Sequence, residues 1–300
     1  MLCNGCPRAC NVDREYSRGF CGMGVKPVVA KAFLHMWEEP CISGTMGSGT
    51  VFFSGCNLKC IFCQNHEISH DGHGREFTIE ELSTLFLSLR DQGAHNINLV
   101  TPSHFVPSIQ AALYMAKKNK QEEEHGTYKP LDIPVVYNTN GYDTMEGLQL
   151  LEGYIDIYLP DLKYISSEIS MNYSGAKDYF ENASEAIQEM YRQVGAPVFD
   201  DNGILKQGII IRHLVLPGHI NESLRVLEWI KENLPKDVYV SLMSQYIPCH
   251  LAREHAVLGR RLTRYEQDKV LVKFEKLGLN GFVQDRAAAS EQYIPDFNHL

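Results

Sequence analysis

Three cysteines, Cys56, Cys60 and Cys63, lie within eight residues with the spacing C-x3-C-x2-C. A structural zinc site takes four protein ligands, and this run offers only three. A cubane iron–sulfur cluster has four irons, so three cysteine ligands leave one iron free to take an outside ligand. The spacing therefore indicates a [4Fe–4S] cluster with an open position. Zinc completed by a remote residue, and three unrelated thiols, are the alternatives.

A second group of cysteines, with the spacing C-x2-C-x3-C-x10-C, comprises Cys3, Cys6, Cys10 and Cys21. Four thiols so close in sequence can close a tetrahedral zinc site or hold a second cluster. A short segment with little apolar content gains folding free energy from either metal. The spacing predicts one shared metal centre and does not separate Zn from Fe–S.

Composition narrows the class of protein. The chain has 300 residues, is 44% hydrophobic and carries a formal net charge of −9. No run of about 18 apolar residues occurs, and the first residues lack the basic and apolar parts of a signal peptide, so we expect a cytoplasmic protein without a membrane partner. Nine cysteines in a reducing compartment indicate metal or redox chemistry rather than disulfides. The scattered basic residues argue against free nucleic acid as a partner.

Short apolar, β-branched runs alternate with amphipathic helical patterns, which predicts parallel βαβ units. The candidate strands are residues 50–55, 96–102, 133–140, 155–161, 208–217 and 238–246. The helical patterns between them include residues 79–93, 108–119, 184–195 and 223–234. Because the strands are apolar nearly throughout, we expect both faces of the sheet to be buried.

Nearly every candidate strand is followed by reactive or hydrogen-bonding residues. In (β/α) barrels the active site forms at these carboxyl ends, and contributions from six strands fit a barrel mouth better than a single crevice. We therefore predict an α/β fold with a partial, TIM-like (β/α)6 barrel. The predicted divisions are a Cys-rich N-terminal extension (1–49), the barrel (50–250) and a C-terminal segment packing on the barrel (251–300).

The cysteine run after the first candidate strand resembles the radical S-adenosylmethionine (radical SAM) superfamily. Phe62 matches the aromatic residue that this family usually places before its third cysteine, near the adenine. The chain is most similar to an uncharacterised branch related to the activating enzymes of pyruvate formate-lyase. The motifs that carry this resemblance are CPRxC, CQNxEIS, NLVTPxHF, YNTNGY, DIYLPDLKY, IRHLVLPG and SLMSQYxP.

The resemblance implies that Cys56, Cys60 and Cys63 hold a [4Fe–4S] cluster whose fourth iron is chelated by S-adenosylmethionine. The family's GGEP-like segment is replaced here by NLVTPSHF. Thr101 and Ser103 are therefore the candidates to bind the ligand's amine. A plain strand-to-helix turn with Ser103 as the N-cap is the alternative.

The other motifs receive roles by the same resemblance. Asn138 and Asn140 are placed near the ribose or carboxylate of the ligand, although a plain Asn-Gly turn is an alternative. Arg212 is expected near the carboxylate, for which its fork of donors is suited. Gln245 is expected to meet adenine or substrate.

Four residues are candidates for substrate contact. Asp161 and Lys163 form a D-x-K pair like one that lies beside the substrate peptide in the activating enzymes; a structural ion pair is the alternative. His104 could approach the ligand's amine, and Tyr246 could meet adenine or substrate.

The activity implied is reductive cleavage of S-adenosylmethionine to a 5′-deoxyadenosyl radical that abstracts hydrogen from a substrate. Flavodoxin or ferredoxin is the expected one-electron donor. A protein glycyl residue is the first substrate hypothesis, and a ribosomal peptide or small metabolite is the second. A metal-binding or regulatory module without radical chemistry is the alternative of another class.

Overall fold

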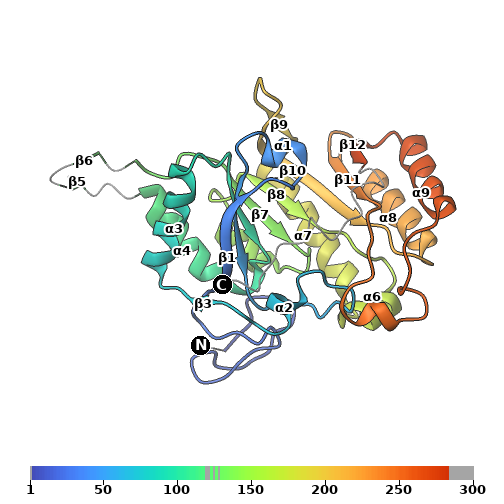
Figure 1. Cartoon of the computed structure of the whole chain (residues 1–300), viewed down its shortest axis with the longest axis horizontal. Coiled ribbons are helices and arrows are strands. Elements are labelled where there is room, and N and C mark those ends of the chain that lie inside the picture. Colours follow the sequence, from blue (N-terminus) through green and yellow to red (C-terminus); the bar gives the residue numbers. More distant parts are fainter. Residues whose placement is uncertain (1, 119–121, 124–125, 128, 284–300) are drawn as a thin grey trace.

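The computed structural model describes residues 2–118, 122–123, 126–127 and 129–283 (Figure 1). Within this part of the chain, ten strands form one sheet, in which β9 pairs only with β10 and the other nine follow the order β12-β11-β10-β8-β7-β4-β2-β1-β3. Their bounds are β1 Val28–His35, β2 Ser48–Phe53, β3 Arg75–Glu76, β4 Ile97–Val100, β7 Val135–Thr139, β8 Ile157–Pro160, β9 Val198–Phe199, β10 Leu205–Leu214, β11 Tyr239–Met243 and β12 Asn280–Val283. A separate hairpin pairs β5 (Glu122–Glu123) with β6 (Gly126–Thr127).

The six strands β2, β4, β7, β8, β10 and β11 are mutually parallel and correspond to the six predicted runs. Every residue of β2, β7 and β8 is buried, which agrees with apolar strands covered on both faces. The prediction of an α/β partial barrel is confirmed.

Helices connect the strands. Their bounds are α1 Pro40–Ser43, α2 His66–Ser69, α3 Ile79–Asp91, α4 Val106–Lys118, α5 Met145–Leu151, α6 Ser167–Ser174, α7 Tyr179–Val194, α8 Ile220–Asn233 and α9 Arg264–Leu277, with 3-10 turns at Ser103–Phe105 and His250–Glu254. Figure 1 shows α3 and α4 at one end of the sheet and α8 and α9 at the other, with α7 between them. No helix of the described residues is both long and apolar enough to cross a membrane.

Local sequence explains where these helices begin. Thr78 caps α3 by accepting a hydrogen bond from the Glu81 N–H, and Glu81 accepts one from the Thr78 N–H in return. Thr263 and Glu266 form the same capping box at α9. Each box satisfies two N–H groups that have no partner within the helix, so it defines the first turn.

Four strands of the sheet were not predicted: the two-residue strands β3 and β9, and the longer β1 and β12. β1 runs antiparallel to β2 and lies within the residues expected to form the Cys-rich extension. Five of its eight residues are only half buried, so its apolar alternation is weak. β12 adds a further parallel strand beside β11, within the residues expected to pack on the barrel as a C-terminal segment. Residues 284–300 of that segment lie outside the described residues, and the division into 1–49, 50–250 and 251–300 stays a prediction.

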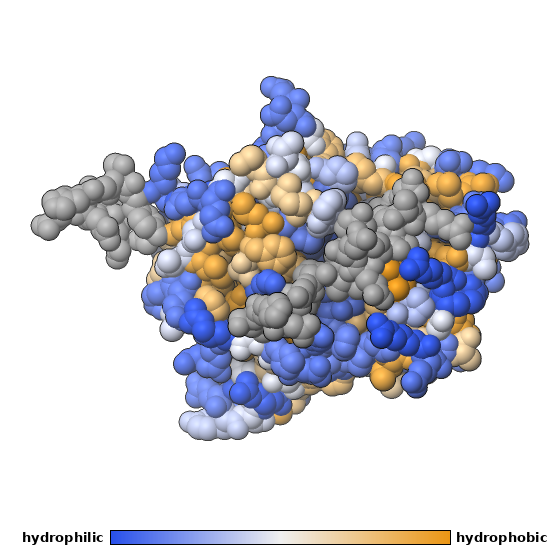
Figure 2. Space-filling model, viewed as in Figure 1, coloured by the Kyte–Doolittle hydropathy of each residue, from blue (hydrophilic) through white to orange (hydrophobic). Residues whose placement is uncertain are grey.

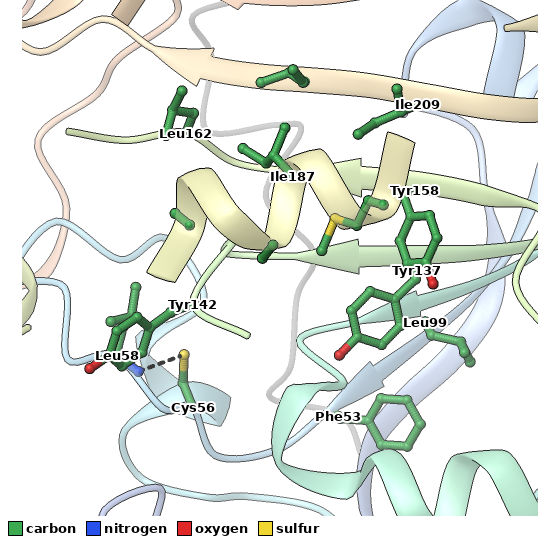
Figure 3. Packing of buried hydrophobic residues seen from close by; sticks show 14 of the residues in the cluster. Phe53, Cys56, Leu58, Leu99, Tyr137, Tyr142, Tyr158, Leu162, Ile187 and Ile209 are labelled. Carbon is green, nitrogen blue, oxygen red and sulfur yellow. Dashed lines mark hydrogen bonds between the residues drawn. The ribbon is translucent and has the colours of Figure 1, made fainter. Parts of the chain in front are cut away.

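The hydrophobic core reaches the end of β2, where the first cysteine of the three-cysteine run begins. Cys56 and Leu58 belong to the same buried cluster as Phe53 on β2 and Tyr142 after β7. Figure 3 shows Tyr142 and Leu58 together beside the Cys56 sulfur, apart from the rings of Tyr137 and Tyr158. The start of the cysteine loop is therefore packed like core rather than like a surface loop.

Gly141 joins the ends of β7 and β8 by a close approach that a side chain would prevent. Its φ is +83°, and a Cβ would collide with the Asp161 carbonyl oxygen and lie 3.2 Å from the Tyr179 hydroxyl. We expect Gly141→Ala to lower the free energy of unfolding by about 3 kcal/mol, part from the left-handed backbone and the rest from the collision. Urea denaturation measures this loss.

Gly153→Ala is the matched control, because its φ is +80° and nothing lies within 4 Å of the added carbon. That variant should lose only about 1–2 kcal/mol, the cost of the backbone conformation alone. Equal losses in the two variants would contradict the close approach.

Candidate active site

A cavity of about 300 Å³ lies at the carboxyl ends of the parallel strands. Residues that follow or end all six strands line it: Cys56, Cys60 and Cys63 after β2, Thr101 after β4, Asn138 and Asn140 at the end of β7, Asp161 and Lys163 after β8, Arg212 on β10, and Gln245 after β11. The sequence-predicted residues from six separate segments are thus brought to one place.

Gly55 sets the direction in which Cys56 leaves β2. Its φ is +77°, and a Cβ there would lie 2.5 Å from Met23 Cγ and 2.6 Å from the carbonyl oxygen of Cys21. Only glycine accepts both the backbone conformation and this contact. The Cys56 sulfur is buried and accepts hydrogen bonds from the Leu58 N–H at 3.4 Å and the Asn140 side-chain amide at 3.3 Å.

The other two thiols are each held by a hydroxyl group. The Cys60 sulfur lies 3.0 Å from Ser174 Oγ, and the Cys63 sulfur lies 3.2 Å from Ser69 Oγ. Burial, with a smaller contribution from the neighbouring Cys60 thiol, raises the pKa of Cys56 to about 12 and that of Cys63 to about 11. Without a metal these thiols are therefore protonated at neutral pH; a cationic iron centre is what would stabilise them as thiolates.

The arrangement fits a cluster better than a single ion. Among the described residues, no group of three His, Cys, Asp or Glu side chains is placed to hold one metal ion. The three sulfurs instead face a common cavity that is large enough for more than one atom.

A buried set of charges lies on the cavity wall across from the cysteine loop. Arg212 Nε donates to Asp161 at 3.0 Å, another guanidinium nitrogen donates to Asn138 Oδ1, and Lys163 pairs with the second Asp161 oxygen. Burial raises the pKa of Asp161, but the charges of Lys163 and Arg212 outweigh it and hold that pKa below its usual value. Asp161 is therefore a carboxylate that orients two cations.

Glu38 belongs to this set and was missed by the sequence analysis. It precedes α1, its side chain is 12% exposed, and one oxygen lies 3.6 Å from Arg212 Nη1. Asn98 and Asn138 both donate to its other oxygen, at 3.0 and 3.4 Å. Burial raises its pKa despite the arginine. The sequence signal was the acidic pair of residues 38–39 before a proline, which has no periodicity that marks it as buried.

Phe62, Thr101 and Gln245 also line the cavity. Phe62 is buried and packs edge-on against Tyr246, with ring centroids 6.2 Å apart. Thr101 has a φ of +58°, a rare conformation for a β-branched residue, while its N–H donates to the Asn138 carbonyl. Gln245 Oε1 is buried without a hydrogen-bond partner, so one polar group remains available to a ligand.

Three predicted residues do not line the cavity. Ser103 is buried behind it and shares a hydrogen bond with Thr139. His104 bonds through Nε2 to the Ser54 carbonyl oxygen at 2.8 Å. The Tyr246 hydroxyl donates to the Leu258 carbonyl oxygen at 2.9 Å, so its contact with the site is through Phe62.

Arg212→Met should remove the cation that lies beside Glu38 and leave Asp161 paired with Lys163. We expect a loss of about 3–5 kcal/mol in the free energy of unfolding at pH 8, the usual cost of breaking a buried ion pair. Without the arginine, Glu38 and Asp161 bind protons more readily in the folded variant than in its unfolded chain. The loss in the free energy of unfolding, relative to wild type, should therefore become smaller as the pH falls from 8 to 5. Anaerobic urea denaturation across this range measures the trend.

The control is Arg192→Met, which removes an exposed arginine paired with Glu152 and Glu189. Its effect should be smaller and flat over the same pH range, since the pKa of Glu189 is held below its usual value by its hydrogen bond to Arg192. A pH-independent deficit in Arg212→Met would show that Arg212 does not set the ionisation of the two buried carboxylates.

Comparisons with known proteins agree with this geometry. The sequence model of the Radical SAM superfamily matches residues 50–230. MJ0674, an uncharacterised protein of Methanocaldococcus jannaschii, is 33% identical over 93% of this chain and 75% of its own length.

Solved structures show a similar fold at low sequence identity. Streptococcus suis SuiB, solved with its precursor peptide SuiA, aligns with a TM-score of 0.50 and 13% identity, over 77% of this chain. This chain spans 46% of the SuiB chain. A domain of the pyruvate-formate lyase-activating enzyme of Bacteroides vulgatus aligns with a TM-score of 0.41 and 11% identity, over 60% of this chain and 93% of that domain.

The family match covers more than half of the chain and includes the three cysteines together with four of the parallel strands that face them. The cysteines and strand ends inside the matched region are the same ones that line the cavity. The chain belongs to the radical SAM superfamily.

Proposed function

We propose that this protein is a radical SAM enzyme whose active site is the cavity at the carboxyl ends of the parallel strands. The observation that carries the proposal is the meeting of three buried thiols with polar side chains from five further strands around one space of about 300 Å³. A metal-binding module without catalysis would need the thiols but not this wall of charged and amide groups.

Cys56, Cys60 and Cys63 would hold a [4Fe–4S] cluster, which with S-adenosylmethionine supplies one-electron cleavage of a carbon–sulfur bond and hydrogen abstraction from a substrate. The chain's own residues position and shield that chemistry. Asn140 donates to the Cys56 sulfur, and the hydroxyls of Ser174 and Ser69 lie at hydrogen-bond distance from the Cys60 and Cys63 sulfurs. With the sulfurs bound as thiolates, these hydroxyls would donate to them and tune the cluster.

The remaining lining residues divide by chemistry. Phe62 offers an apolar ring for the adenine of S-adenosylmethionine, and Thr101 and Gln245 offer polar groups for its amino acid half or its base. Arg212 supplies a fixed positive charge to the cavity wall, the kind of group that attracts a carboxylate, and its hydrogen bond to Asn138 holds it in place. Asp161 holds both Arg212 and Lys163, so its main role is to position these cations.

The size of the cavity favours a substrate that reaches in at the cavity mouth over one that is fully enclosed. Ligand pockets usually measure about 300–1,000 Å³, so a cofactor as large as S-adenosylmethionine takes up most of this one. A segment of a protein, presenting a glycyl residue at the mouth, suits the remaining space better than an enclosed metabolite. A peptide is the second candidate, since the structurally similar SuiB was solved with a precursor peptide. Flavodoxin or ferredoxin is the proposed electron donor.

The test is anaerobic incubation of the reconstituted, dithionite-reduced protein with S-adenosylmethionine. We expect 5′-deoxyadenosine and methionine to form, and we expect Cys60→Ala to reduce this formation at least about 100-fold, because one cluster ligand is lost. Cys41→Ala is the control, because Cys41 is a buried thiol in a separate group of packed apolar residues. This variant should form 5′-deoxyadenosine as the wild type does. Folded wild-type protein that binds iron and yet forms no 5′-deoxyadenosine would contradict the proposed activity.

The glycyl hypothesis has its own test. Proteins of the source organism labelled with α-deuterated glycine are added to the reduced enzyme and S-adenosylmethionine. Deuterium in the 5′-deoxyadenosine is the expected result. Formation of unlabelled 5′-deoxyadenosine would contradict the glycyl hypothesis. Deuterium transferred from another labelled amino acid would favour a different residue of a protein or peptide as the substrate.

A further inference from the structure

The four N-terminal cysteines meet around a second, small cavity on the far side of Gly55. Cys3, Cys6, Cys10 and Cys21 all line it, together with Arg14 and His104. Backbone N–H groups donate to three of the four sulfurs: Arg8 to Cys6, Phe20 to Cys10 at 3.2 Å, and Met23 to Cys21. Such donors stabilise sulfur as a thiolate ligand.

Two buried nitrogens at this cavity have no partner in the described chain. They are Arg14 Nη2 and His104 Nδ1, and His104 as a whole is only 4% exposed. A buried polar atom without a partner is costly, so each leaves an interaction for an occupant of the cavity. An anionic metal–thiolate centre would satisfy the arginine by charge and hydrogen bonding.

The segment lacks an apolar core of its own that could explain why it is ordered. In Figure 2 the surface over the N-terminal loops is mostly hydrophilic. Apart from its cysteines, Met23 is the one hydrophobic residue before β1 that is well buried and packs on the main core among residues 2–26. A metal centre is the usual source of folding free energy for such a segment.

Four cysteines around one cavity match two kinds of metal centre, a tetrahedral zinc site and a cubane iron–sulfur cluster. Both are anionic when held by four thiolates, and both would tie the four cysteines to one another. The metal content of the protein distinguishes them.

We propose that Cys3, Cys6, Cys10 and Cys21 hold one shared metal–thiolate centre, zinc or a [4Fe–4S] cluster, and that this centre fixes the segment on which the Cys56–Cys63 loop rests. The support is direct. Arg8, two residues after Cys6, donates to the Asn57 carbonyl oxygen at 2.7 Å and to the Gly175 carbonyl oxygen at 2.6 Å. Asn57 adjoins Cys56, and the neighbour of Gly175 is Ser174, whose hydroxyl contacts the Cys60 sulfur.

The second contact is made by Cys21 itself. Its carbonyl oxygen and the Met23 side chain occupy the space that a Gly55 side chain would need. Arg14 adds a third link by donating to the His104 carbonyl oxygen at 2.6 Å. Loss of the N-terminal centre should therefore disturb the three-cysteine loop, whereas loss of the three cysteines leaves the N-terminal ligands in place.

Iron, sulfide and zinc analysis of anaerobically reconstituted full-length protein tests the proposal. Wild type should contain metal beyond the four irons expected at the three-cysteine loop, and a Cys56/Cys60/Cys63→Ala triple variant should keep that metal. About four irons and four sulfides in the triple variant identify the centre as a cluster, and about one zinc identifies it as a tetrahedral site. Wild type with about four irons and a triple variant without metal would overturn the centre altogether. These readouts need no turnover, so they stand apart from the test of the proposed activity.

The support role is tested by Arg8→Met, with exposed Arg18→Met as the control from the same segment. Arg8→Met should keep the metal of the N-terminal centre and lose at least half of the iron bound at Cys56, Cys60 and Cys63. The loss would appear as a weaker S-adenosylmethionine-sensitive signal in electron paramagnetic resonance. Arg18→Met should match wild type. Arg8→Met with the full iron content and an unchanged signal would overturn the support role.

Discussion

The contact of the Gly55 backbone with the Cys21 carbonyl and Met23 is the constraint on which the rest of the site depends. It packs the start of the loop that carries Cys56 against the N-terminal segment, and Cys56 and Leu58 also belong with Tyr142 to the main buried cluster. Packing of this kind restricts the positions that the Cys56 sulfur can take. Precise placement of ligands by surrounding packing is what a metal site requires from its protein. This packing restricts the sequence, because residue 55 must be glycine.

Burial is the second constraint, and it acts on thiols and carboxylates in the same direction. Taking either group out of water disfavours its charged form. For Asp161 the structure compensates with two cations, so the carboxylate remains charged. For Cys56 and Cys63 the hydrogen bonds to the sulfurs compensate too little, so the pKa values stay near 12 and 11. The cavity therefore has one wall whose charges are balanced within the chain and another that requires a metal.

Much of this could be read from the sequence, for identifiable reasons. The parallel strands were predicted because full burial leaves uninterrupted apolar runs, and the strand-end residues were predicted because parallel strands end at one edge. Glu38, β1 and β12 were not, because a buried acid before a proline and half-exposed or short terminal strands leave no periodic signal. The positions of Ser103, His104 and Tyr246 behind the cavity depend on which way a turn directs its side chains. Spacing along the chain does not determine that direction.

Thr101 shows how strain fits into the same scheme. A β-branched residue at φ +58° is held there at a cost of roughly 1–3 kcal/mol, and such a cost persists only where the surroundings fix the conformation. Here the Thr101 N–H is held by the Asn138 carbonyl, and Asn138 in turn is held by Arg212 and by Glu38. The charged wall thus determines the backbone of the turn that faces the cavity. This link makes the ion network part of the geometry of the ligand site, because any change in its charge reaches Thr101 through a single hydrogen-bonded residue.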